Sequence, residues 1–126
     1  MTSRGLALQA IKIAQDKKAK NVVFLNLKGI SIITDYFLIC SGDSSVHMQT
    51  IAKELKRKME EKGVPLLNPS DFLNNSWILL DFGSVVVHIF SEETRQFYQL
   101  ERLWADAVKE NLNEEMNKGL MVRDKT

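Results

Sequence analysis

Apolar residues recur at steps of three and four along two segments of the chain, which is the spacing of one face of an α-helix. The first segment runs over Leu6–Lys18, with Thr2 or Ser3 placed to cap its start. The second begins at the serine pair 44–45 and ends at Gly63, a residue type that favours the left-handed backbone just past a helix end. The apolar stripe of the second helix consists of Met48, Ile51, Ala52, Leu55 and Met59.

Other segments are apolar and β-branched but too short for helices. Continuous apolar runs at Asn21–Leu27 and Tyr36–Ser41 are typical of strands that are buried on both faces. Val64–Leu67 could add a short strand. Trp77–Phe90 contains two apolar runs around a Gly-Ser pair, which predicts a β-hairpin. Because hairpin strands are antiparallel and helices alternate with strands, we expect an α/β fold with a mixed β-sheet flanked by helices.

The composition fits a single domain. The chain has 126 residues, and 44% of them are hydrophobic, which is enough for one core. We expect this domain to span residues 1–107, followed by a polar tail over residues 108–126 that is either helical or frayed. The formal net charge of +1 gives no overall attraction to nucleic acid or to a membrane. A lone cysteine, an N-terminus without an apolar signal core and the absence of a long apolar run predict a cytoplasmic protein.

The hairpin predicts two unlike faces, because side chains alternate across a strand. If Asp81–Ser84 form a tight turn with Gly83 inside it, the loop length fixes which residues pair. One face is wholly apolar and is expected against the helices; it carries Ile78, Leu80, Phe82, Val85, Val87 and Ile89. The other face mixes aromatic residues with an acid and an imidazole; it carries Trp77, Leu79, Asp81, Val86, His88 and Phe90.

The mixed face has two interpretations. Aromatic side chains supply much of the binding energy of protein interfaces and polar groups fix the orientation, so this face could bind a partner. Alternatively, Trp77 and Phe90 could pack beneath a terminal helix, with His88 hydrogen-bonded inside the protein. Both interpretations stay open at this point. An exposed aromatic face could also pair with a second copy, so a homodimer of the free protein is a further hypothesis.

Three motifs, in order along the chain, resemble those of the ribosomal silencing factor family, also called the Iojap family. They are DYFLICSGDS at Asp35–Ser44, WILLDFGSVVVHIF at Trp77–Phe90 and TRQFYQLERLW at Thr94–Trp104. The resemblance extends over roughly Leu6 to Ala107. It implies a fold similar to that of nucleotidyltransferases.

The resemblance also implies a function and a set of contact residues. Family members are translation repressors that bind the large ribosomal subunit through ribosomal protein fourteen of that subunit and block subunit association under nutrient limitation. A large-subunit assembly factor that uses the same surface is the alternative. Aromatic residues would anchor the partner, and acids would meet basic side chains of the ribosomal protein. The implied partner-binding residues are Trp77, Asp81, His88, Phe90, Glu93, Tyr98, Leu100, Glu101 and Trp104.

Enzymatic alternatives have less support in the residues. A nucleotidyltransferase needs paired carboxylates after its Gly-Ser turn to hold metal ions, and the strand after Gly83-Ser84 has none. The turn Ser41–Ser45 lacks the lysine and the glycine spacing of a phosphate-binding loop. Asp81 and His88 are not directly opposed in the expected register, which disfavours a catalytic pair. A nucleotide-dependent transferase is therefore the least favoured alternative, and we expect no enzymatic activity.

Metal and nucleic-acid sites are also disfavoured. The two histidines and the single cysteine are widely separated in the sequence, so we expect neither a metal site nor a cofactor. The basic run of Lys53, Lys56, Arg57, Lys58 and Lys62 is interpreted as the solvated side of its helix. At most, this run would make peripheral contact with ribosomal RNA.

Overall fold

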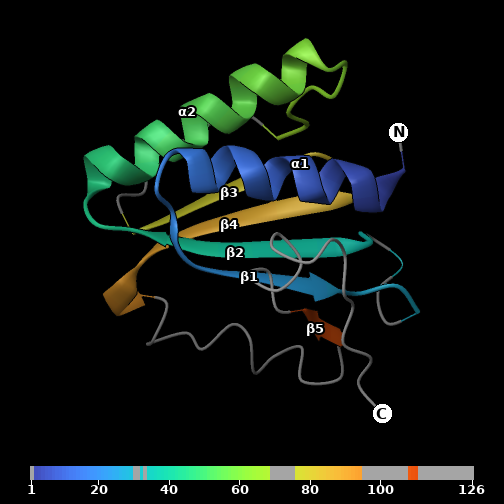
Figure 1. Cartoon of the computed structure of the whole chain (residues 1–126), viewed down its shortest axis with the longest axis horizontal. Coiled ribbons are helices and arrows are strands. Elements are labelled where there is room, and N and C mark those ends of the chain that lie inside the picture. Colours follow the sequence, from blue (N-terminus) through green and yellow to red (C-terminus); the bar gives the residue numbers. More distant parts are fainter. Residues whose placement is uncertain (1, 30–31, 33, 69–75, 95–107, 111–126) are drawn as a thin grey trace.

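A β-sheet organises the part of the chain that the structure describes. The computed structural model describes residues 2–29, 32, 34–68, 76–94 and 108–110. Within these residues, two helices cover one face of a five-stranded sheet (Figure 1). The elements are α1 (Ser3–Asp16), β1 (Lys20–Asn26), β2 (Tyr36–Gly42), α2 (Ser45–Glu61), β3 (Trp77–Asp81), β4 (Val85–Ser91) and β5 (Val108–Glu110).

The sheet is mixed, as predicted. Its strand order is β3-β4-β2-β1-β5. β2 and β4 run parallel, with Tyr36 beside Val85 and Gly42 beside Ser91, whereas every other neighbouring pair is antiparallel. β2 and β4 are not consecutive in the chain: α2 and β3 lie between them, and a parallel pair needs such a long connection. The α/β fold with a mixed sheet flanked by helices is therefore confirmed.

Both helices begin at caps that the sequence predicts. The Thr2 hydroxyl accepts the Gly5 N–H at 3.0 Å, and the Ser44 hydroxyl accepts the His47 N–H at 3.0 Å. α2 ends just before Gly63, which has a φ of +82°, a conformation that strains any residue with a Cβ. Neither of these helices combines the length and the apolar character that a bilayer span requires.

The larger core lies between the helices and the sheet. The predicted stripe of α2 is buried there, so Met48 and Met59 are core residues, as expected. The wholly apolar hairpin face also belongs to this core, which confirms its predicted position against the helices. Its six members are Ile78, Leu80, Phe82, Val85, Val87 and Ile89.

A second, smaller cluster lies on the opposite face of the sheet. Its buried members are Leu25, Leu27, Ile39 and Phe90. Half-buried Val23, Phe37 and Trp77 pack against it. The central strands therefore have buried apolar side chains on both faces, which explains their continuous apolar sequences.

Two segments differ from the prediction. The segment Val64–Leu67 forms no strand, although the Leu67 N–H donates to the Asp81 carbonyl at the edge of β3, at 2.7 Å. The first residues of the predicted tail form β5, which pairs antiparallel with β1 and places Lys109 opposite Leu25. The sheet therefore extends past residue 107, and residues 111–126 of the predicted tail lie outside the described part of the chain.

Candidate functional site

The β3–β4 hairpin has the predicted register. The Phe82 N–H donates to the Val85 carbonyl at 2.9 Å, which leaves only Gly83 and Ser84 in the turn. Gly83 has a φ of +92°, and its N–H donates to the Asp81 carboxylate at 2.8 Å. We call the side of the hairpin that faces away from the helices the outer face. Its cross-strand pairs are Trp77 with Phe90, Leu79 with His88, and Asp81 with Val86.

Aromatic rings pack together on this outer face. The Trp77 and Phe90 ring centroids are 4.9 Å apart, and the His88 ring is parallel to that of Phe90 at 6.1 Å. Phe37, on the neighbouring strand β2, meets the His88 ring edge to face at 4.5 Å. The indole Nε1–H of Trp77 donates to Nδ1 of His88 at 3.2 Å. Three strands thus contribute to one aromatic cluster with a hydrogen bond at its centre.

His88 is held neutral inside this cluster. Its side chain is 4% exposed, and burial lowers the pKa of the imidazole to about 4. Because Nδ1 accepts the indole N–H, the proton of the neutral ring lies on Nε2. That Nε2 atom is buried and has no hydrogen-bond partner among the described residues. The ring is therefore suited to holding Trp77 in place and not to transferring protons at neutral pH.

Exposure on the outer face increases from β4 to β3. Phe90 is fully buried and Val86 is almost so, whereas Leu79 is 38% exposed. Trp77 and Asp81 are half-buried. The edge strand therefore carries the side chains of this face that can touch another molecule, and β4 supports them from inside.

This gradient bears on the two interpretations of the mixed face. The internal hydrogen bond of His88 and the packing of Trp77 on Phe90 agree with the interpretation in which these residues are interior. In this conformation, His88 and Phe90 offer no surface for the direct partner contact that the resemblance implies, because both side chains are buried. Trp77 and Asp81 keep part of their surface, and their contact with a partner stays a prediction.

The open edge of β3 is partly covered by Leu67 and Asn68, which carry no functional signal in the sequence. The Asn68 side chain donates to the Leu79 carbonyl at 2.9 Å and accepts the Asp81 N–H at 2.9 Å. The side chain thereby makes the two hydrogen bonds that the backbone of a neighbouring strand would make with β3. Leu67 beside it is 62% exposed, so two exposed leucines, Leu67 and Leu79, lie along this edge. An asparagine in a linker is too common to have signalled this contact in advance.

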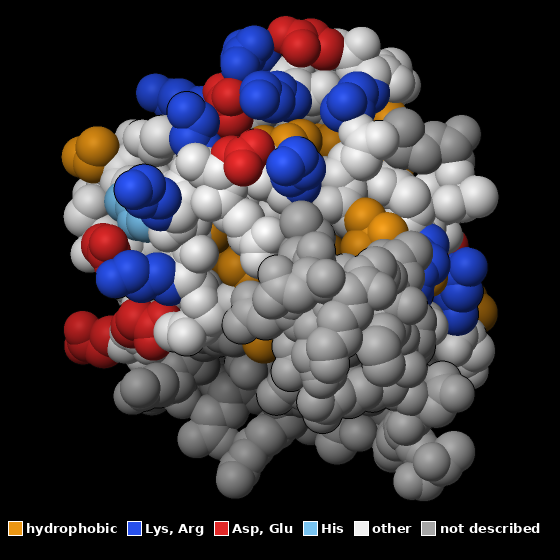
Figure 2. Space-filling view, in the orientation of Figure 1, with side chains coloured by type: hydrophobic (Ala, Val, Ile, Leu, Met, Phe, Trp, Pro, Cys, Tyr) orange, Lys and Arg blue, Asp and Glu red, His pale blue; other side chains and the backbone are white. Residues whose placement is uncertain are grey.

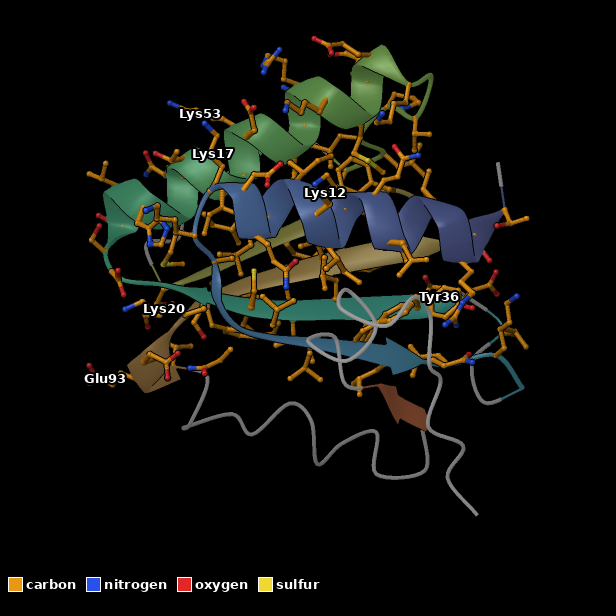
Figure 3. The ribbon with its side chains drawn as sticks, viewed as in Figure 1. Lys12, Lys17, Lys20, Tyr36, Lys53 and Glu93 are labelled. Atoms are coloured by element: carbon orange, nitrogen blue, oxygen red, sulfur yellow. The ribbon has the colours of Figure 1, made fainter. Side chains whose placement is uncertain are left out.

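The predicted contact residues after β4 are only partly described. Ser91 caps a new helical turn, because its hydroxyl accepts the Thr94 N–H at 3.2 Å. Glu93 is exposed in that turn, at the end of the sheet where Lys20 also lies (Figure 3). Four predicted partner-binding residues lie outside the described part of the chain: Tyr98, Leu100, Glu101 and Trp104.

The polar turn between β2 and α2 is occupied by internal contacts. The His47 ring accepts the Asp43 N–H on Nδ1 at 2.8 Å and bonds the Lys17 carbonyl through Nε2, also at 2.8 Å. Lys20 forms an ion pair with Asp43 at 2.9 Å. His47 therefore ties the start of α2 to the end of α1. Within the described residues, no three His, Cys, Asp or Glu side chains are grouped so that they could hold a metal ion.

The comparison with protein families decides which family the chain belongs to. The family model described as "Ribosomal silencing factor during starvation" matches residues 1–125. The chain belongs to the ribosomal silencing factor family. The resemblance of the three sequence motifs is thereby confirmed.

Ribosomal silencing factors of two bacteria are similar over most of the chain. One from Halalkalibacterium halodurans is 45% identical over 107 residues, which are 85% of this chain and 92% of the relative. One from Bacillus subtilis is 38% identical over 117 residues, 93% of this chain and 99% of the relative. The chloroplastic protein Iojap of Arabidopsis thaliana is 34% identical over 85% of this chain, but the match covers 44% of that longer protein.

Crystal structures support the fold of this silencing factor. A structure from Bacillus halodurans has a TM-score of 0.71 at 44% identity and covers 82% of this chain and 95% of that one. A protein from Chromobacterium violaceum has a TM-score of 0.80 at 27% identity, with coverage of 83% and 88%. The likeness to nucleotidyltransferases stays a prediction.

Proposed function

We propose that this silencing factor represses translation by binding the large ribosomal subunit through ribosomal protein fourteen of that subunit. In this proposal the bound protein blocks association with the small subunit under nutrient limitation, and it acts in the cytoplasm. The observation that carries the proposal is family membership over residues 1–125, together with relatives that are named as ribosomal silencing factors.

The geometry of the hairpin supports a binding role for β3. Leu79 and the half-buried Trp77 present apolar surface at an edge strand, and the Asp81 carboxylate lies next to them. Apolar anchors beside an acid suit a partner that is itself basic, as ribosomal proteins commonly are. The buried pair His88 and Phe90 would keep Trp77 in a fixed orientation, which lowers the entropy lost on binding.

The same geometry favours binding over catalysis. The one imidazole on the outer face is neutral and enclosed, and the Asp81 carboxylate already accepts the Gly83 N–H within the turn. The register places Leu79, and not Asp81, opposite His88, so no acid–imidazole pair forms there. We therefore propose that the protein acts by occupying a surface.

A pull-down with isolated ribosomal protein fourteen tests this proposal. Leu79→Asp places a charge in the apolar part of the surface, and we expect about 5- to 30-fold weaker binding, since interface anchors contribute on the order of 1–2 kcal/mol. Val46→Asp is the matched control, because Val46 is an apolar side chain that is 72% exposed at the start of α2. Circular dichroism must show that both variants are folded. Equal loss of binding in the two variants would show that β3 is not the contact surface.

The exposed leucines of the β3 edge also suit contact between two copies of the free protein. We propose that such a homodimer uses the outer face and competes with the ribosomal partner. Sedimentation velocity should then show a dimer that Leu79→Asp shifts to monomer and Val46→Asp does not. A monomer at all concentrations tested would exclude this dimer.

A further inference from the structure

Charge is distributed unevenly between the helices and the rest of the chain. Residues 3–18 and 45–62, which contain α1, α2 and their C-terminal caps, carry nine lysines and arginines against four acids, a formal charge of +5. The whole chain has a formal charge of +1, so all other residues together carry −4. The near-neutral total therefore conceals a strongly basic helical layer. Figure 2 shows lysine and arginine side chains gathered over these two helices.

Only part of this positive charge is neutralised within the layer. The Glu54 carboxylate binds Arg57 at 2.9 Å and Lys58 at 3.5 Å, and Arg57 also reaches Glu61 at 2.9 Å. The hydrogen bond from Arg57 is the main reason why the pKa of Glu54 is lowered, and the charge of Lys17 on the other helix adds to the effect. Lys12, Lys53 and Lys62 are exposed and form no ion pair with a described residue.

Lysines from both helical segments border a shared cleft. The cleft lies between α1 and α2 and has a volume of about 410 Å³. Lys12 lines it from α1, and Lys58 and Lys62 line it from the C-terminal end of α2, with Gln9, Ile13 and Asp16 completing its walls. Figure 3 shows Lys12, Lys17 and Lys53 on the viewed side of the helical layer. We call this surface, with Lys12, Lys17, Lys53, Lys58 and Lys62, the basic helical face.

We propose that the basic helical face binds the phosphate backbone of RNA, and that it does so while the hairpin holds a protein partner. The charges are spread along two helices instead of converging on one point, which suits a chain of phosphates better than a single small anion. α1 and α2 contain no Phe, Tyr or Trp. The face therefore provides point charges for phosphates and no platform for stacking bases.

The position of the face makes simultaneous binding feasible. Ile78 and Leu80 point from β3 into the core beneath the helices, whereas Leu79 points to the outer face, away from them. The helices and the exposed part of the hairpin therefore lie on opposite sides of the sheet (Figure 1). This inference rests on the proposed function, because the large ribosomal subunit is what would present a basic protein and RNA together.

Binding of a fluorescein-labelled RNA hairpin at varied salt tests the proposal. We expect the wild-type protein to bind in 50 mM salt and to lose affinity as salt rises, since each phosphate contact releases counterions. The variant Lys12→Gln/Lys53→Gln/Lys62→Gln removes three charges and no internal ion pair. The slope of log affinity against log salt should become shallower by about 2 to 3. Between 50 and 200 mM salt the wild-type protein should therefore lose about 16- to 64-fold more affinity than the variant.

Two single variants serve as controls. Glu60→Gln removes an exposed acid from the same layer and should tighten binding of the RNA hairpin. Lys28→Gln removes an exposed lysine from the connection between β1 and β2, and it should leave the slope unchanged. Identical slopes for the wild-type protein and the triple variant, or no binding by the wild-type protein in 50 mM salt, would overturn the proposal and leave the lysines as a solvated helix face.

Sedimentation with isolated large subunits separates this inference from the proposed function. If only the inference fails, the triple variant will sediment with large subunits to the same extent as the wild-type protein at every salt concentration. If the proposed function fails, the wild-type protein will not sediment with large subunits at all, whatever its affinity for the RNA hairpin. The inference would be supported if the triple variant no longer sediments with large subunits at 200 mM salt. The same variant must still bind isolated ribosomal protein fourteen as tightly as the wild-type protein does.

Discussion

Trp77 and His88 are joined side chain to side chain across the hairpin, with the indole N–H of Trp77 donating to Nδ1 of His88 at 3.2 Å. The two residues are diagonal neighbours, because Trp77 pairs with Phe90 and His88 with Leu79. The bond connects the half-buried edge of the outer face to its interior. It therefore links the orientation of a candidate contact residue to the stability of the fold.

A double-mutant cycle measures this link. Trp77→Phe keeps the ring beside Phe90 but leaves the buried Nδ1 atom of His88 without its donor, and we expect a loss of about 1–2 kcal/mol in the free energy of unfolding. In a His88→Phe background the same Trp77→Phe change should have a smaller effect, because no acceptor remains. Urea unfolding followed by circular dichroism gives the free energies of unfolding of the wild-type protein, the two single variants and the double variant. Additive effects would show that the hydrogen bond does not couple the two residues.

The stability of the protein should fall in mild acid because of His88. Its pKa is about 4 in the folded protein and near the ordinary value of 6.5 when unfolded, so between these values the unfolded chain binds a proton that the folded protein does not. The contribution is complete above pH 6.5 and is lost as the pH falls toward 4. At pH 5 we expect a loss of roughly 2 kcal/mol relative to pH 7.5.

His88→Phe is the control for this pH dependence, because carboxylates elsewhere also titrate in acid. The difference in unfolding free energy between the wild-type protein and the variant should shift by roughly 2 kcal/mol in favour of the variant between pH 7.5 and pH 5. A difference that stays constant over this range would mean that His88 is not held neutral by burial.

A side chain at position 42 should destabilise the fold. A Cβ at this position would lie 2.6 Å from Cγ of Met48 and 3.1 Å from its backbone nitrogen, so α2 would have to move. We expect Gly42→Ala to lower the unfolding free energy by about 1–3 kcal/mol. Gly63→Ala is a useful comparison, since it meets no atom within 4 Å and should lose only about 1 kcal/mol through its positive φ. Thermal unfolding of both variants should show that Gly42→Ala is the more destabilised of the two.

The side chain of Asn68 should be needed to hold the edge of β3. Asn68→Ala removes its bonds to the Leu79 carbonyl and to the Asp81 N–H, and we expect a loss of about 1–2 kcal/mol in unfolding free energy. Asn68→Asp keeps an acceptor for the Asp81 N–H but no donor, so its effect should be intermediate. Hydrogen exchange of the Asp81 amide reports on the edge directly. Unchanged exchange in Asn68→Ala would contradict this role.

The features that follow from local chemistry could be predicted from the sequence. Helix caps at Thr2 and Ser44, the turn at Gly83 and the alternation of the hairpin faces each depend on residues close together in the chain. The mixed sheet followed from the same reasoning, since a hairpin added to strands that alternate with helices leaves few arrangements.

The features that depend on distant contacts could not be predicted. Nothing in the hairpin sequence says that Phe90 is covered while Leu79 is exposed, because that depends on which segments pack on the outer face. β5 pairs with β1 across more than eighty residues, and three polar or apolar residues in a tail carry no strand signal of their own. The role of Asn68 likewise depends on a strand that comes later in the chain.

In the proposed function, this silencing factor prevents the two ribosomal subunits from joining. The direct measurement is light scattering after small subunits are added to isolated large subunits that were first mixed with an equimolar amount of the purified protein. We predict a reduced joining signal with the wild-type protein and with Val46→Asp, and a restored signal with folded Leu79→Asp. An undiminished signal with the wild-type protein, at concentrations where it sediments with large subunits, would contradict the claim.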